Sequence, residues 1–331
     1  MRSVPAHSFA RLTELGALWH AWHQCRRGKR RRPTLATFEL EADRILFRLQ
    51  RDLRSGRYQA SPWRLRAIED PKLRLIAAPA VRDRVVHQAL LAEIGPTYER
   101  SFIDHSFAAG NGRGPHRAVL QYLAWLRRFG YRLHLDVSGY FLNVDHGRLA
   151  EDIFGRLGDL DTRRLIERVI ASGDTLYQHP LARRVLGGKA PPPGRGLPLG
   201  SWFSQWSGAY YLNPMDHYVK RALKVPGYLR YMDDFLLFAD QRDRLEEARM
   251  ALAEWLATHR GLRLNPKRLT VCPNAVPGVF LGDRVSRAGI APSRKLRRRM
   301  KARLRHAAAA GEESLIRSIR SYRGLLCFPY V

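Results

Sequence analysis

Residues 228–239 read YLRYMDDFLLFA, with two acidic residues between two apolar runs. The runs 228–231 and 235–239 are short and rich in aromatic and aliphatic residues, so they are predicted to form the two strands of a hairpin. Asp233 and Asp234 then occupy the turn, where adjacent carboxylates repel each other unless a cation lies between them. An ordinary polar turn is the alternative, because Asp is common in turns. The apolar flanks favour a metal site.

A third carboxylate ends another predicted strand. Residues 131–137 read YRLHLDV, and their alternation of side chains predicts a strand that ends at Asp136. If this strand lies beside the hairpin, the carboxylates can hold two metal ions about 3.5–4 Å apart. Magnesium, which takes oxygen ligands from carboxylates and substrate phosphates, is the expected ion, with Mn²⁺ as a substitute. Taken alone, Asp136 would be read as a strand-end cap.

The charge of the chain points to a polyanionic partner. Lys and Arg number 58 and Asp and Glu number 30, so the net charge at pH 7 is +28. A folded protein this basic repels itself unless a polyanion binds it, and nucleic acid is the leading candidate. The basic runs 26–32 and 294–305 are candidates for phosphate contacts, although each is also compatible with a solvated surface.

Several other classes of protein are disfavoured by the sequence. No stretch of 18 apolar residues predicts a membrane span, and the N-terminus lacks the pattern of a secretory signal, so we expect a cytoplasmic protein. Cys25, Cys272 and Cys327 lie far apart, which argues against a disulfide framework and a structural zinc site. His20 and His23 near Cys25 are better explained by packing on a helix than by metal binding.

The remaining pattern predicts an α+β protein. Strands are expected near 63–68, 73–77, 131–137, 228–231, 235–239, 279–281 and 285, with turns at 70–71 and 110–114 and a loop over 187–196. Helices are expected over 8–24, 37–54, 82–95, 115–128, 146–157, 161–172, from about 201, over 243–259 and over 293–320. No internal repeat is visible.

These motifs, in this order, resemble a reverse transcriptase over nearly the whole chain. The segment 136–141, DVSGYF, resembles the first palm motif, and 231–234, YMDD, resembles the hairpin with two metal ligands. The segment 196–200, GLPLG, followed by Ser204 and Gln205, resembles the motif that supports template and incoming nucleotide. Weaker matches are RLIAAP at 74–79, DRVVHQA at 83–89, LNPK at 264–267 and FLG at 280–282.

The resemblance implies a right-hand polymerase fold and a function. Fingers would occupy 1–125 with 150–195, the palm 126–149 and 196–290, and a short basic thumb 291–331. The expected activity is RNA-directed DNA synthesis from template RNA, a DNA primer and dNTPs, with two Mg²⁺ ions. The implied metal ligands are Asp136, Val137, Asp233 and Asp234; Lys267 would protonate pyrophosphate, Arg74, Phe141, Leu199, Gly200 and Gln205 would bind the nucleotide, and Phe280, Leu281 and Gly282 would form the primer grip.

Within the family, the chain looks most like reverse transcriptases of diversity-generating retroelements. Residues 199–205, LGSWFSQ, fit their [IVL]-G-x-x-x-S-Q pattern, which implies copying errors at template adenines and a small basic helical accessory protein. Ser138 and Gly139, and the segment 110–116, depart from the pattern of that group. An antiphage-defence reverse transcriptase would share the same chemistry and remains an alternative.

Two further classes fit less well. A viral RNA-dependent RNA polymerase normally carries an Asp where Phe141 stands, and a ring there would select deoxynucleotides instead. A non-catalytic RNA-binding scaffold with a palm fold would usually have lost the acids, and all three are present. No RNase H or endonuclease domain is expected in the remaining length.

Overall fold

The computed structural model describes residues 3–30, 32–69, 73–110 and 112–326. The turn predicted at 70–71, and Arg31, Asn111 and Cys327, lie outside the described residues. The chain divides into two compact units. The first unit comprises Met1–Ile103, Val137–Met215 and Trp255–Arg263, and the second comprises Asp104–Asp136, Asp216–Glu254 and Leu264–Val331.

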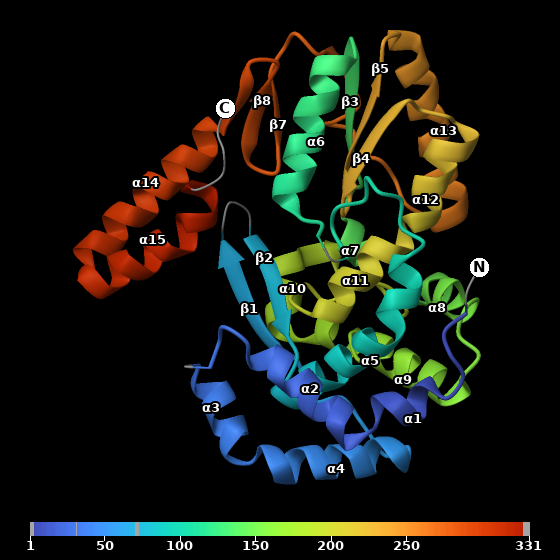
Figure 1. Cartoon of the computed structure of the whole chain (residues 1–331), viewed down its shortest axis with the longest axis vertical. Coiled ribbons are helices and arrows are strands. Elements are labelled where there is room, and N and C mark those ends of the chain that lie inside the picture. The colour runs from blue at the N-terminus through green and yellow to red at the C-terminus, as the bar shows by residue number, and fades with distance from the viewer. Residues whose placement is uncertain (1–2, 31, 70–72, 111, 327–331) are drawn as a thin grey trace. The chain divides into compact units, whose positions relative to one another are not determined.

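The second unit is built on a four-stranded antiparallel sheet. Its order is β4-β5-β3-β6, formed by β3 (Tyr131–Asp136), β4 (Gly227–Tyr231), β5 (Asp234–Ala239) and β6 (Val271–Pro273) (Figure 1). Residues 235–239 of β5 are all buried, which explains why this strand reads as a continuous apolar run rather than as an alternating one. Of the two strands of the predicted hairpin, β5 is therefore internal to the sheet, and β4 lies at its edge.

Helix α6 (Pro115–Arg128) contributes the largest part of the core beside this sheet. Its apolar side chains recur at helical spacing and pack against residues of β4, β5 and the next sheet. That next sheet is antiparallel and contains β7 (Gly278–Phe280), β8 (Asp283–Ser286) and β9 (Gly289–Pro292). The shared core consists of Phe107, Ala118, Val119, Tyr122, Leu123, Trp125, Leu126, Phe129, Leu229, Leu236, Phe238, Phe280, Val285 and Ile290.

Helices dominate the first unit, with α5 (Val81–Glu99) at its centre. Around α5 pack α1 (Ser8–Leu12), α2 (Leu15–Arg26), α3 (Pro33–Leu40), α4 (Ala42–Arg54) and α11 (Trp202–Tyr211). The unit also contains α7 (Tyr140–Asn143), α8 (His146–Phe154), α9 (Leu160–Ala171), α10 (Pro180–Leu186) and the antiparallel hairpin of β1 (Arg64–Glu69) and β2 (Leu73–Ala78).

The fold class is α+β, as predicted. Three predicted helices are each divided in two. The helix expected over 8–24 is interrupted between α1 and α2. The helix expected over 37–54 is interrupted at Glu41, because α3 and α4 each pack an apolar stripe against the core. The helix expected over 293–320 is α14 (Arg294–Ala309) and α15 (Glu312–Leu326), separated at Gly311, whose φ of 107° is incompatible with a helix.

Helices α12 (Asn213–His217) and α13 (Arg242–Arg260) follow α11 and β5 in the sequence, with a short π-helix at Tyr218–Ala222 after α12. No helix in the described part of the chain is long and apolar enough to cross a membrane. The division into fingers, palm and thumb stays a prediction.

Candidate active site

The sheet of the second unit brings the three predicted acidic residues together. In the hairpin of β4 and β5, Tyr231 pairs with Asp234, so Met232 and Asp233 form a two-residue turn. Met232 has φ 57°, a left-handed conformation that is uncommon for residues other than glycine and typical of tight hairpin turns. In the neighbouring pair of strands, Asp136 lies directly opposite Asp234. The end of β3 therefore meets the tip of the hairpin.

Asp136 and Asp233 form an electrostatically strained pair. Burial, followed by the charge of Asp136, raises the pKa of Asp233 from 3.8 to about 7. Asn265 orients Asp136 from two directions: its Nδ2 donates to Asp136 Oδ2 at 2.9 Å, and its main-chain N–H donates to Asp136 O at 2.7 Å. A divalent cation between the carboxylates would relieve their repulsion, and hard oxygen donors suit Mg²⁺ or Mn²⁺. The donor set therefore fits the predicted ions.

Asp234, unlike Asp136 and Asp233, contacts a histidine and an arginine side chain. His134 Nε2 contacts Asp234 Oδ1, and Arg268 Nη1 lies 3.1 Å from the same oxygen. Among the described residues no three His, Cys, Asp or Glu side chains form a ready-made metal cluster, which agrees with Asp234 being balanced by cationic and polar partners. Asp136, Asp233 and Asp234 are the residues that would hold a metal ion here, and Asp234 is paired with Arg268 in this structure.

Asp233 should make the metal-free protein less stable as pH rises. Because its folded pKa of about 7 lies above the ordinary 3.8, its stabilising contribution is complete below about pH 4 and is lost as pH rises through 7. Asp233→Asn removes the charge, so we expect the variant to exceed wild type in stability by about 1–3 kcal/mol at pH 8 but not at pH 4. Denaturant unfolding of both proteins in EDTA at the two pH values measures this; an equal difference at both would contradict the coupling.

The first unit brings several of the predicted nucleotide-binding residues near one another. Arg74 is exposed on β2, and the main-chain N–H of Ala77, three residues on, donates to Leu199 O at 2.7 Å. Gly200 must be glycine, because its φ is 124° and a Cβ there would lie 2.5 Å from Ala77 O. Arg74 and Leu199 line one cavity of about 170 Å³, whose other residues are Leu73, Leu75, Ala77, Leu142, Leu176, Tyr177, Leu186, Leu197 and Pro198.

Phe141 and Gln205 lie elsewhere in the same unit. Phe141, in α7, accepts a hydrogen bond at its main-chain oxygen from Leu197 N at 2.7 Å, and its ring packs close to Gly208 of α11. Gln205 is exposed on α11 and shares a cavity of about 510 Å³ with Gly200 and Trp202. Cations from other elements also line this cavity, namely Lys29, Arg32 and Arg84. Gln205 and Gly200 thus border a basic recess with an exposed aromatic ring.

Residues 69–285 match the model of the reverse transcriptase (RNA-dependent DNA polymerase) family, and this match spans more than half of the chain. The chain belongs to this family. The two acidic motifs at Asp136 and at 233–234 lie inside the matched range, together with every predicted nucleotide-binding and primer-grip residue. The predicted family is therefore confirmed, whereas the roles of individual residues stay proposals.

Individual known proteins show more distant similarity to this reverse transcriptase. Protein YkfC of Escherichia coli (strain K12) is 26% identical in an alignment of 279 residues, covering 72% of this chain and 70% of YkfC. The apo telomerase of Candida tropicalis is 11% identical, with a TM-score of 0.50 over 71% of this chain and 49% of the telomerase chain. Telomerase of Candida albicans, solved with the TWJ fragment of telomeric RNA, has a TM-score of 0.48, 11% identity, and coverage of 81% and 55%. The chain spans about half the length of these telomerases. The likeness to the telomerase of Candida tropicalis concerns the fold alone, and it confirms the predicted right-hand polymerase fold.

Of the remaining predicted site residues of this reverse transcriptase, Lys267 and the three primer-grip residues lie in the second unit, whereas Val137 is buried and belongs to the first unit. Lys267 is exposed, and its main-chain N–H donates to Asn265 Oδ1 at 3.1 Å, so it is adjacent to the residue that orients Asp136. Phe280 is buried, and its ring meets that of His134 edge to face at 5.8 Å. Leu281 and Gly282 form a turn after β7 with φ of 51° and 97°. The predicted primer-grip turn is thus linked to Asp234 through His134.

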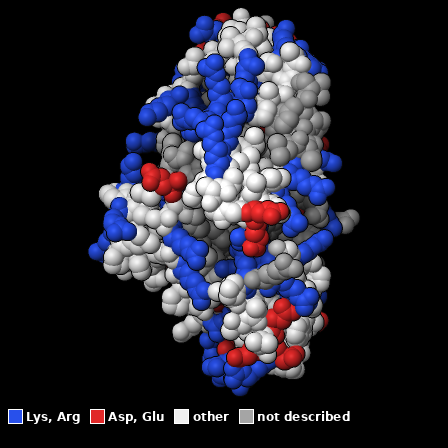
Figure 2. Space-filling model, turned by 90° about the vertical axis from the view of Figure 1, so that its left-hand side faces the viewer, with Lys and Arg blue, Asp and Glu red and all other residues white. Residues whose placement is uncertain are grey.

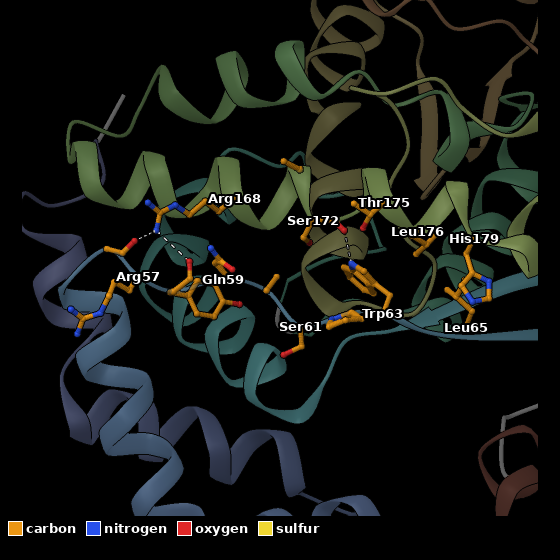
Figure 3. A pocket seen from close by; sticks show the side chains of 15 residues that line it. Arg57, Gln59, Ser61, Trp63, Leu65, Arg168, Ser172, Thr175, Leu176 and His179 are labelled. Carbon is orange, nitrogen blue, oxygen red and sulfur yellow. Dashed lines mark hydrogen bonds between the residues drawn. The ribbon is translucent and has the colours of Figure 1, made fainter.

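A larger cavity in the first unit contains none of the predicted site residues. It measures about 730 Å³ and lies between the segment before β1 and helix α9 (Figure 3). Arg168 donates to Gly56 O at 2.6 Å, and Trp63 Nε1 donates to Ser172 O at 2.8 Å, so these side chains tie its two walls together. The predicted site residues therefore do not coincide with this cavity.

His134, Asn265 and Arg268 were not predicted as site residues. One signal for His134 was present, because residues two apart on a strand share a face and His134 precedes Asp136 by two. Asn265 and Arg268 flank the predicted Lys267, but the sequence does not show that the loop after α13 returns to the end of β3.

Proposed function

We propose that this protein copies a template RNA into DNA, by nucleotidyl transfer at Asp136 and Asp233. The observation that carries the proposal is that these two partly buried carboxylates interact with each other. Burial and the charge of Asp136 raise the pKa of Asp233 to about 7. Such a pair is poised to bind cations rather than to remain charged alone. Two Mg²⁺ ions, when bound, would stabilise the attacking and leaving oxygens.

The surrounding residues supply binding and proton transfer. Asp136, Asp233, Asp234 and the main-chain oxygen of Val137 are the proposed metal ligands, and Asn265 holds the carboxylate of Asp136 in place. Lys267 presents an exposed ammonium group beside Asn265 and would donate a proton to pyrophosphate. These roles require a primer 3′-hydroxyl and a dNTP triphosphate to lie between the proposed metal ligands and Lys267.

The nucleotide-binding roles are assigned to the first unit. Arg74 carries an exposed guanidinium, whose planar fork of donors suits a triphosphate. Phe141 would lie against the sugar, and Gly200 and Gln205 against the base pair. Phe280, Leu281 and Gly282 of the second unit would hold the primer. Fingers, palm and thumb would have the boundaries predicted above.

Charge favours template RNA and DNA primer as the partners. Figure 2 shows a face on which Lys and Arg cover far more surface than Asp and Glu. Helix α14 carries no acidic residue and presents the basic residues Arg294, Lys295, Arg297, Arg298, Arg299, Lys301, Arg303 and Arg305. Electrostatic attraction to phosphates is the sequence-independent part of nucleic-acid affinity. We assign α14, in the proposed thumb, to the nucleic-acid backbone.

The finer proposal is that of an error-prone retroelement enzyme, with antiphage defence as the alternative role. It rests on Leu199, which is half-buried and lines a cavity with Arg74, so it is not an enclosed core residue. Leucine offers neither donor nor acceptor to an incoming nucleotide. A small basic accessory protein is part of this proposal, and a substitution at Leu199 tests it.

Leu199→Gln should reduce errors opposite template adenine by roughly two- to tenfold, because one gained hydrogen bond is worth about 0.5–1.5 kcal/mol. The measurement is the substitution spectrum of cDNA made from one defined RNA. Leu186→Gln is the matched control, since Leu186 lines the same cavity but has no proposed contact with the nucleotide. Rare wild-type errors spread evenly over four template bases would reject the mutagenic role and favour a defence enzyme.

A further inference from the structure

We infer that Arg230 is a positioning residue that fixes the peptide bond before Asp233, and with it the metal-binding carboxylate. The inference rests on the proposed metal-binding role of Asp233. Arg230 lies on β4, two residues before Met232, and its side chain is 0% exposed. A guanidinium withdrawn so completely from water must have its hydrogen bonds supplied by the protein.

The side chain of Arg230 makes two kinds of contact. On one side, its Nε and Nη2 donate to the two carboxylate oxygens of Asp216 at 2.7 and 2.5 Å, and Nη2 also donates to Ser106 Oγ at 3.2 Å. On the other side, its Nη1 donates to Met232 O at 3.0 Å. Tyr228 OH completes the network by donating to Asp216 Oδ1 at 2.7 Å. The guanidinium thus bridges α12 and the turn of the hairpin.

The bond to Met232 O acts directly on Asp233. The carbonyl of Met232 and the N–H of Asp233 belong to the same planar peptide unit. A rotation of this peptide would break the hydrogen bond from Arg230 Nη1 and would turn the main chain that carries the Asp233 side chain. Arg230 therefore sets the direction from which Asp233 faces Asp136.

The turn needs such a support. Met232 has φ 57°, and a non-glycine residue in this region persists only where its surroundings enforce it. The main chain of Arg230 is also held in place, since its N–H donates to His105 O at 2.9 Å and its carbonyl accepts from Phe107 N at 2.9 Å. Arg230 is thus anchored at its main chain and at Asp216, and its Nη1 reaches the turn.

A buried ion pair is a poor device for stability alone, because apolar residues of similar size often replace such pairs without loss. This property makes the inference testable. In a triple variant, Arg230→Met and Asp216→Leu remove the ion pair and the hydrogen bond to Met232 O. Tyr228→Phe removes the hydroxyl group that would otherwise lose its acceptor on Asp216. The matched control is Arg260→Met with Asp152→Leu, which removes an Arg–Asp pair of 2.8 Å from the first unit.

Two readouts separate positioning from folding. Mn²⁺ binding, followed by electron paramagnetic resonance without nucleic acid, reports the metal site, and primer extension gives kcat and the KM for dNTP. We expect the triple variant to fold, to bind Mn²⁺ about 10-fold more weakly, and to lose roughly 10- to 100-fold in kcat, as for other supports of metal ligands. Its KM for dNTP should stay near that of wild type. The Arg260/Asp152 control should match wild type in Mn²⁺ affinity and kcat.

A folded triple variant with wild-type Mn²⁺ affinity and kcat would overturn the inference. If the triple variant does not fold, Arg230→Lys decides the question, because a single ammonium group can pair with Asp216 but cannot reproduce the fork that also reaches Met232 O. Equal Mn²⁺ affinity of Arg230→Lys and wild type would then overturn it. If the proposed function itself is wrong, the result is different: the wild-type protein would bind Mn²⁺ no more tightly than the Asp233→Asn variant.

Discussion

Asp233→Asn should abolish RNA-directed DNA synthesis while the protein stays folded. Losing a metal ligand removes several kcal/mol of transition-state stabilisation, which corresponds to a rate loss of at least about 1,000-fold. The fold should persist because burial and Asp136 already disfavour the charge of Asp233. Primer extension on an RNA template measures the loss, and thermal unfolding in EDTA verifies that the variant is folded.

The matched control is Asp243→Asn, which makes the same chemical change at an exposed position in the first turn of α13. It should extend primers at the wild-type rate. Asp136→Asn should behave like Asp233→Asn, since the two carboxylates would share a metal ion. Near-normal extension by a folded Asp233→Asn or Asp136→Asn protein would refute the assignment of the catalytic centre.

Phe141→Ala should weaken discrimination against ribonucleotides by roughly 10- to 100-fold in the ratio of kcat/KM for dNTP and rNTP. An aromatic ring beneath C2′ of the sugar leaves no room for a hydroxyl, and overpacking of this kind costs about 1–3 kcal/mol. In the structure the ring of Phe141 is half-buried and meets Tyr140 edge to face at 5.4 Å. Single-nucleotide incorporation with each substrate gives the ratio.

Phe141→Tyr serves as the control, because it keeps the ring and should keep the preference for dNTP. The competing explanation is that Phe141 only packs against Gly208 and its neighbours. In that case Phe141→Ala would lower the melting temperature but leave the ratio between the two substrates unchanged. The two explanations therefore differ in sugar selectivity, not in stability.

The hairpin that contains Asp233 and Asp234 could be predicted because residues adjacent in the sequence are enough to define it. An apolar run on each side of two acids defines two strands and a turn without reference to the rest of the chain. The strand ending at Asp136 was equally visible. What periodicity alone could not give is the antiparallel pairing of β3 with β5, which brings Asp136 opposite Asp234 across about a hundred residues. The family resemblance supplied that step.

The residues that contact the acidic side chains and Arg230 could not be predicted either, because they come from distant parts of the chain. Arg268 and Asn265 approach the site from a loop that follows α13, and Asp216 reaches Arg230 from α12. Each is an ordinary polar residue in sequence and acquires its role from tertiary contacts. The break at Glu41 was missed because apolar residues continue across it. The break between α14 and α15 had a local signal in Gly311, since glycine commonly ends a helix, and this signal was overlooked.

RNA-directed DNA synthesis by this protein is tested most directly by primer extension with the purified wild-type protein on one defined RNA template, with Mg²⁺ and each set of nucleotides in turn. We expect a DNA product whose sequence is complementary to the template, formed with dNTPs, suppressed with rNTPs and absent when the metal is chelated. A folded protein that binds the RNA but makes no complementary DNA with either Mg²⁺ or Mn²⁺ would contradict it.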